Sequence, residues 1–200
     1  ISSGDFYLFR LSPAQRRSAI ILTLLSCGGP MTISALSRLL YVSKGTLMKD
    51  LKAAEAYFAA QGVAFSPSRS KGYQLELPES LRRSLLYQNV LPLVADGFPA
   101  LQPANVLYRF IAGRLFLSER EAALQSAVAD IEARLGLQLD DAAFNQFVLY
   151  LNIWAGRVCG GHFVGEGDHK NGAARGSASS LMAGHLADSV EAAFSIHVPE

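Results

Sequence analysis

The residues from Met31 to Leu77 constrain the fold of this chain more than any other stretch. They comprise a short run with apolar residues at helical spacing, a brief turn, a longer run with the same spacing, and two extended segments. Apolar residues that recur every three to four positions predict a helix with one buried face, whereas strict alternation predicts a half-buried strand. The order therefore predicts two helices joined by a tight turn and followed by a β-hairpin.

Helix start signals support this interpretation and add a helix in front. Ser12 and Gln15 form a capping box, with proline at the first helical position, ahead of a helix that should end at the Gly-Gly-Pro run of 28–30. Thr32 and Ser43 can cap the two helices that follow. Three helices are therefore expected before the hairpin.

The third of these helices is predicted to have one buried side and one basic side. Apolar residues at helical spacing form the buried side, namely Leu47, Leu51, Ala54 and Phe58. Polar and basic residues near its start form the other side, namely Lys44, Thr46, Lys49 and Lys52. A helix held across another helix commonly presents such residues to base edges and phosphates in the major groove. The residues expected to contact DNA from this helix are Ser43, Lys44, Thr46 and Lys49.

The two extended segments are expected to form a wing beside the helices. Residues 73–77 alternate apolar and polar side chains, and Pro67 should end the preceding strand, because proline cannot donate to a ladder. Arg69 and Lys71 fall in the turn, where a basic tip would lie on the DNA backbone or in the minor groove. Residues 12–78 are therefore predicted to be a winged helix-turn-helix that binds double-stranded DNA. A small helical bundle with a hairpin and a solvated charged face is the alternative.

The rest of the chain is also predicted to be helical. Residues 1–11 are expected to be a lead-in from a preceding domain, residues 79–101 a linker helix, and residues 102–200 an all-helical regulatory bundle. Within the bundle, a capping box at Ser118 and a cap at Asp140 predict two helix starts. The expected fold class is mainly α: a winged helix-turn-helix of three helices and a hairpin, followed by a helical bundle.

Several motifs resemble sugar-operon regulators of the BglG/LicR/mannitol-activator type. The run VSKGTLMKDLKAAEAYFAAQGV, followed by KGYQLELPESLRRSLL, is similar to their winged-helix part. The matching positions are Val42, Ser43, Thr46, Asp50, Gly72, Tyr73 and Arg82. The runs IEARLGLQLDDAAFNQFVLYLNIWAGRV and LADSVEAAFSIHVPE resemble the two ends of a PTS regulation domain, an all-helical module that phosphotransferase-system proteins phosphorylate on histidine.

This resemblance implies a function and a set of partners. It implies a DNA-binding transcription regulator of a carbohydrate-uptake operon, with activation favoured, that is controlled through a phosphotransferase-responsive helical domain. It also implies a fragment of a larger regulator, truncated at its C-terminal end. Phosphotransferase-system proteins and double-stranded DNA are the expected partners, and a homodimer is expected because paired helix-turn-helix units read paired half-sites.

One departure from the family pattern concerns its regulatory histidine. The resemblance places a phosphorylatable His seven residues before Arg157, and this chain has Tyr150 there. Tyrosine has no imidazole nitrogen, so it cannot form phosphohistidine. Tyr150 is interpreted as a packed aromatic side chain with its hydroxyl at the surface, and the alternative is a regulatory pocket that is not phosphorylated. Arg157 is expected to contact a carboxylate, a carbonyl or the Tyr150 ring, and the helix of 141–157 is expected to be buried throughout, at a twofold dimer seam.

Composition limits the other possibilities. The net charge is only +1, so any nucleic-acid footprint must be local. Cys27 and Cys159 form no metal or disulfide pattern and indicate a reducing, cytoplasmic setting. No signal peptide or membrane span is predicted. The spacing of His162, Asp168 and His169 matches no zinc pattern. We therefore expect no enzyme activity, no metal and no cofactor.

Two alternatives from other classes remain. The winged helix could be a spacer that does not contact DNA, in a larger regulator where the bundle only dimerises. The cations at Lys44, Lys49, Arg69 and Lys71 suffice for modest DNA affinity, but Asp50 and Glu55 offset them, and this balance separates the two readings. RNA antitermination, which some relatives perform, requires a β-rich leading domain that nothing in this sequence resembles.

Overall fold

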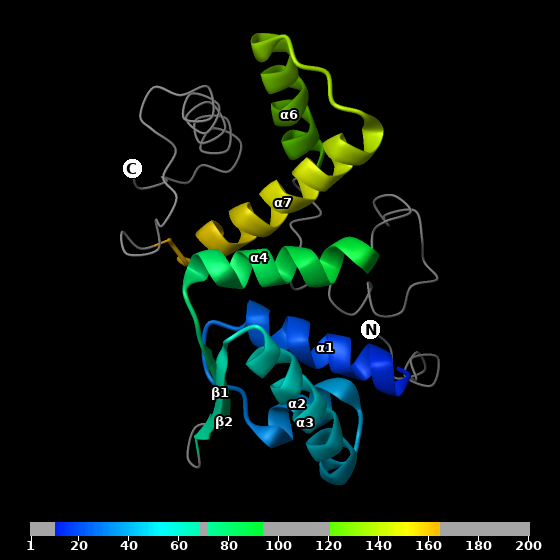
Figure 1. The fold of residues 1–200 in the computed structure, drawn as a ribbon, viewed down its shortest axis with the longest axis vertical. Coiled ribbons are helices and arrows are strands. Elements are labelled where there is room, and N and C mark those ends of the chain that lie inside the picture. Colours follow the sequence, from blue (N-terminus) through cyan, green and yellow to red (C-terminus); the bar gives the residue numbers. More distant parts are fainter. Residues whose placement is uncertain (1–10, 69–71, 94–120, 165–200) are drawn as a thin grey trace. The chain divides into compact units, whose positions relative to one another are not determined.

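A computed structural model of the chain describes residues 11–68, 72–93 and 121–164 (Figure 1). The described residues are mainly helical and include one antiparallel sheet of two strands, so the expectation of a mainly α chain is confirmed. The elements are α1 (Pro13–Ser26), α2 (Ile33–Leu40), α3 (Lys44–Ala60), β1 (Ala64–Ser68), β2 (Gly72–Glu76), α4 (Glu79–Val90), the short 3₁₀ helix η2 (Leu91–Leu93), α6 (Glu121–Leu135) and α7 (Asp141–Cys159).

By their contacts, the described residues separate into two compact units. The first contains the residues up to Leu77 together with 88–93, and the second contains 78–87 together with 121–164. The division therefore falls within α4. The predicted lead-in of 1–11, apart from Leu11, lies outside the described residues, as do Arg69, Lys71 and the capping box predicted at 118–121, apart from Glu121.

The start signals in the first unit act as the sequence predicts. The Ser12 hydroxyl accepts a hydrogen bond from the Gln15 backbone N–H at 3.2 Å, and the Gln15 side chain accepts one from the Ser12 N–H at 2.8 Å. Thr32 caps α2 by accepting from the Ala35 N–H at 3.1 Å. These side chains satisfy N–H groups that a helix leaves unpaired in its first turn. The capping predictions are confirmed.

The turn between α2 and α3 is tied by hydrogen bonds at both ends. Tyr41 ends α2 in the left-handed region, with φ of 52°, which is uncommon for a residue with a side chain. The Ser37 hydroxyl donates to the Val42 carbonyl, and the Val42 N–H donates back to the Ser37 carbonyl. Ser43 then caps α3 by accepting from the Thr46 N–H at 3.1 Å. This geometry fixes the direction in which α3 leaves α2.

The hairpin differs from its prediction at Pro67. Strand β1 continues through Pro67, which pairs with Tyr73, so the expectation that Pro67 ends the strand is wrong. The N–H and C=O of Tyr73 are both bonded to Met31, each at 2.8 Å. Because these groups point away from β1, the Pro67–Tyr73 pair is one that exchanges no hydrogen bonds, and the missing proline N–H removes no ladder bond.

Three aromatic rings join the hairpin to α3. Phe58 of α3 is fully buried and stacks on Phe65 of β1, with ring centroids 5.6 Å apart. Phe65 stacks on Tyr73 of β2 at 5.0 Å. The predicted apolar face of α3 is completely buried, and its members are Leu47, Leu51, Ala54 and Phe58. The hairpin is therefore held against the helix from which it follows.

In the second unit, α6 packs against α7. The predicted stripe of α6 is buried at Leu124, Val128 and Ile131, but its last member, Leu135, is 37% exposed. Gly136 follows Leu135 in the left-handed region, with φ of 62°, and ends the helix there. Asp140 caps α7 as predicted, by accepting from the Ala143 N–H at 2.7 Å.

Helix α7 is buried over only part of its length. Its residues from Val148 to Val158 are mostly buried, whereas the first turns, which begin at Asp141, are exposed or half-buried. The prediction that the helix is buried throughout is therefore wrong for this chain by itself. Asp141, Ala142 and Gln146 are exposed in these turns, and Phe144 and Phe147 are only half-buried, so the first part of the helix keeps apolar surface uncovered within this chain.

Candidate nucleic-acid interface

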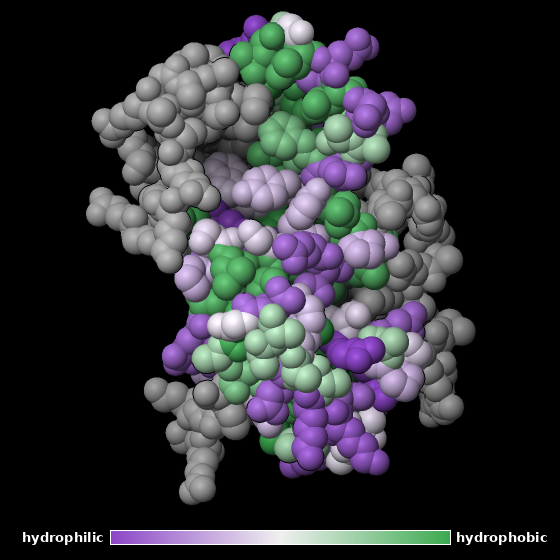
Figure 2. Space-filling view, in the orientation of Figure 1, coloured by the Kyte–Doolittle hydropathy of each residue, from purple (hydrophilic) through white to green (hydrophobic). Residues whose placement is uncertain are grey.

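The exposed side of α3 is basic. Lys44, Lys49 and Lys52 are exposed, whereas Thr46 is half-buried. Figure 2 shows hydrophilic side chains gathered at the bottom of the view, where α2 and α3 lie in Figure 1. The structure thus places the three lysines on a surface that a negatively charged partner could reach.

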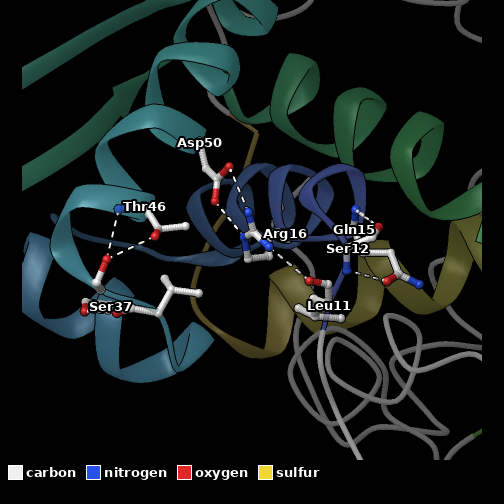
Figure 3. A network of polar contacts seen from close by, with 9 residues as sticks. Leu11, Ser12, Gln15, Arg16, Ser37, Thr46 and Asp50 are labelled. Carbon is white, nitrogen blue, oxygen red and sulfur yellow. Dashed lines mark hydrogen bonds and ion pairs between the residues drawn. The ribbon is translucent and has the colours of Figure 1, made fainter.

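Asp50 does not share this surface, contrary to the balance of charges expected from the sequence. Its carboxylate accepts hydrogen bonds from Arg16 of α1, from Nε at 2.7 Å and from Nη2 at 3.4 Å (Figure 3). The Asp50 side chain is only 11% exposed, and Arg16 also donates to the Leu11 carbonyl at 3.0 Å. The negative charge of Asp50 is therefore paired with Arg16 inside the unit, and this ion pair links α3 to α1.

Ser43 and Thr46 are engaged at the start of α3. The two hydroxyl oxygens lie 3.0 Å apart, and the Ser43 oxygen also accepts from the Thr46 N–H. The structure therefore gives both predicted DNA contacts a role in capping. Ser43 is itself an exposed residue.

Sequence reasoning missed two features of this surface, at Met48 and Gly45. Met48 is 40% exposed although it is apolar, and it lies one helical turn from both Lys44 and Lys52. Its sulfur lies 3.9 Å from the hydroxyl of Tyr73, so it borders the hairpin. Gly45 is exposed in the first turn of the helix. A helical wheel of the sequence places both residues beside the lysines, so they could have been identified from helical spacing alone.

The second unit contains a cluster of charged side chains around Glu79, at the start of α4. Arg157 of α7 binds this carboxylate at two points, with Nε to Oε1 at 2.8 Å and Nη2 to Oε2 at 2.7 Å. Arg83 donates to Oε1 at 3.1 Å, and Arg82 lies 3.7 Å from Oε2. The expectation that Arg157 contacts a carboxylate is confirmed, and the identity of that carboxylate was not predicted.

Burial and charge oppose each other at this cluster. Burial alone would raise the pKa of Glu79, but the hydrogen bonds and attraction of Arg157 and Arg83 outweigh it and hold the pKa below its usual range. Arg83 also donates to the backbone carbonyl of His162 at 2.7 Å. Burial and the nearby arginines lower the pKa of the His162 ring and favour its neutral form.

Tyr150, at the position of the family's histidine, contacts an aromatic ring at the surface. Its side chain is 42% exposed, and its ring meets the ring of Tyr87 edge-on, with centroids 5.9 Å apart. This arrangement agrees with the interpretation of Tyr150 as a packed aromatic residue at the surface. The Arg157 side chain, by comparison, binds the Glu79 carboxylate.

Within residues 11–68, 72–93 and 121–164, no group of three His, Cys, Asp or Glu side chains could hold a metal ion. His169 and Asp168, considered from the sequence, lie outside these ranges. None of the described helices is long and apolar enough to cross a membrane.

The sequence matches no model of a known protein family, and a comparison with curated proteins finds no relative. What the chain does must therefore be inferred from its own residues and their geometry.

Proposed function

We propose that this chain is a DNA-binding transcription regulator of a carbohydrate-uptake operon, whose first unit is a winged helix-turn-helix with α3 as its recognition helix. The observation that carries the proposal is the inward position of Asp50. Since Arg16 binds that carboxylate, the exposed charged side chains of α3 are Lys44, Lys49, Lys52 and Glu55. Three cations and one anion leave a net charge of about +2 on this face, in a chain whose total is +1.

Such a local concentration of charge suits a DNA phosphate backbone. A protein that neutralises phosphates releases condensed counterions, and this release supplies most of its affinity for any sequence. The position of the lysines in the first half of the helix also supports the proposal, because recognition helices contact DNA mainly through their N-terminal residues. Lys44, Lys49 and Thr46 are the side chains that we propose for base or phosphate contacts.

The hairpin would act as the wing of this domain. Its aromatic stack on Phe58 and its two hydrogen bonds to Met31 give it a fixed position beside α3. A tip held in this way would carry Arg69 and Lys71 to the backbone of the same duplex. A wing that swung freely would lose more conformational entropy on binding and contribute less affinity.

We further propose that the second unit is regulatory, as its resemblance to PTS regulation domains implies. Tyr150 replaces the family's phosphorylatable histidine, so control at this position would not use phosphate. The bidentate contact of Arg157 with Glu79 supports this view, since the arginine is already paired with a negative charge that belongs to the chain. We also propose that the histidines of this chain do not carry a regulatory phosphate.

Binding of the full chain to duplex DNA tests the proposal. Sites selected from a pool of duplexes with a randomised centre would be labelled with a fluorophore and titrated by fluorescence anisotropy. A variant with Lys49→Ala and Lys52→Ala should bind at least about tenfold more weakly than the wild type at moderate salt, because it loses two cations from the proposed interface. Arg134→Ala removes one exposed cation from α6, outside the proposed interface, and should leave the affinity unchanged. Equal affinity of all three proteins would refute the proposal and favour the spacer alternative.

A further inference from the structure

Gly45 is an unusual residue for its place in the fold. It is the second residue of α3 and is exposed. Glycine in a helix is less favourable than alanine, because the unfolded chain loses more conformational freedom when a glycine becomes ordered. A glycine at such a position is therefore expected to have either a conformational or a steric reason.

The described part of the fold supplies neither reason. Gly45 has no left-handed backbone, and a Cβ atom added to it would meet only the Ser43 hydroxyl oxygen, at 3.9 Å, which is an ordinary contact. Gly72 shows the opposite case. Its φ is +97°, and an added Cβ would lie 2.3 Å from the Met31 carbonyl oxygen, so the hairpin requires glycine there. The fold thus accounts for Gly72 and leaves Gly45 without an internal explanation.

The position of Gly45 on the helix indicates an external explanation. Lys49 and Lys52 follow it by four and seven residues, which places all three on one exposed face. Met48, three residues on, borders the same face. Gly45 is therefore a shallow point on the helix surface, surrounded by two lysines and an exposed methionine. A glycine on a binding face allows a partner to approach the backbone closely.

We propose that Gly45 is the point at which α3 comes closest to duplex DNA, and that its missing side chain lets the helix enter the major groove deeply enough for base contacts. This inference rests on the proposed function. It assigns specificity to a residue without a side chain, whereas Lys49 and Lys52 supply general affinity. Long lysine side chains still reach phosphates when the helix is held slightly farther out, but base contacts require fixed short distances.

Gly45→Ala should therefore separate stability from recognition. The variant should unfold at a temperature roughly 1–4 °C higher than the wild type, because alanine favours the helix and meets no obstacle. Its affinity for a selected site should fall about tenfold or more, the loss expected when a base contact is broken. Its affinity for duplexes of unrelated sequence, and the salt dependence of that affinity, should stay unchanged because the lysines remain.

The experiment compares four full-length proteins: the wild type, Gly45→Ala, Lys49→Ala and Gly29→Ala. Gly29 precedes α2, and an added Cβ there meets nothing within 4 Å, so its variant is a control for an added methyl group away from α3. Each protein is titrated with a duplex selected from a randomised pool and with a scrambled duplex, at several salt concentrations. Thermal unfolding is measured on the same samples.

The possible results separate failure of the inference about Gly45 from failure of the proposed DNA binding. Loss of selected-site affinity in Gly45→Ala, with scrambled-site affinity and thermal stability retained or raised, supports the inference. Unchanged selectivity in Gly45→Ala, while Lys49→Ala binds more weakly, overturns the inference and leaves the proposed function intact. A lower unfolding temperature for Gly45→Ala also overturns it, because the fold would then require the glycine. Failure of the wild type to bind either duplex refutes the proposed function itself.

Discussion

Replacing Glu79 with glutamine should destabilise the second unit strongly. The substitution keeps the shape of the side chain but removes the charge that binds Arg157 at two points and Arg83 at a third. The side chains of Glu79, Arg157 and Arg83 are only 11%, 7% and 6% exposed, so water cannot readily replace the lost carboxylate. Removal of one partner from a buried ion pair costs about 3 kcal/mol or more. For a chain of this size, that corresponds to a fall of roughly 6–12 °C in the unfolding temperature.

The stability of the wild type and that of Glu79→Gln should also depend differently on pH. Because the folded pKa of Glu79 lies below the usual value of 4.5, its carboxylate is ionised more readily in the folded chain than in the unfolded chain. The resulting stability is present above about pH 4.5 and is lost as the pH falls through the lower, folded pKa. In Glu79→Gln this loss should be absent, so the difference between the two proteins should shrink at low pH.

Urea unfolding followed by circular dichroism at neutral and acidic pH measures both effects. Glu55→Gln makes the same chemical change at an exposed position of α3 and should alter stability by no more than about 0.5 kcal/mol. A Glu79→Gln protein as stable as Glu55→Gln at neutral pH would refute the reasoning. So would a difference from the wild type that persists unchanged in acid.

Three further predictions concern the hairpin, the DNA contacts and the regulatory unit. Gly72→Ala should cost about 3 kcal/mol or more in urea unfolding, since the backbone is left-handed and the Met31 carbonyl occupies the space; stability equal to Gly29→Ala would contradict this. Lys71→Ala should weaken binding to all duplexes and reduce the slope of log affinity against log salt by about one, and an unchanged slope would place the tip away from DNA. Tyr150 should stay unmodified when the chain is incubated with a histidine phosphocarrier and phosphate donor. Mass spectrometry under neutral conditions that finds stoichiometric phosphate on any histidine of this chain would overturn the view that this part of the switch is silent.

A further prediction concerns the association of two copies of this chain in solution. The chain should form a dimer, because operators read by paired helices need two copies of the binding unit. The first turns of α7, where Phe144 and Phe147 are half-buried, leave apolar surface that a second copy could cover. Light scattering should give twice the 21.5 kDa mass of one chain. A mass of one chain at high micromolar concentration would contradict the prediction.

Local features of the fold could be predicted from the sequence because neighbouring residues determine them. The caps at Ser12, Thr32, Ser43 and Asp140 act within three residues, and each set the start of its helix correctly. The buried face of α3 was also predicted fully, since helical spacing alone defines it. The exposed lysines are the complement of that face and followed from the same pattern.

Interactions between distant residues could not be predicted in the same way. Arg16 and Asp50 are 34 positions apart, and Glu79 and Arg157 are 78 apart. A sequence pattern shows that each residue is charged but not that tertiary folding brings the pair together, so Asp50 was counted against DNA binding. The prediction that Pro67 ends its strand was wrong for a related reason. The effect of a proline in a strand depends on whether the paired residue, here Tyr73, directs its N–H and C=O toward that strand. In each case the outcome depended on a partner residue that the local sequence does not identify.

Nuclear magnetic resonance can show whether α3 contacts DNA. Backbone amide shifts of the isotopically labelled full chain would be followed as a selected duplex is added. If α3 binds DNA, the largest shift changes should fall on residues 43–52, and the amides of α6 should change little. Changes confined to the second unit, or no changes at saturating duplex, would contradict the claim that the basic face of α3 binds DNA.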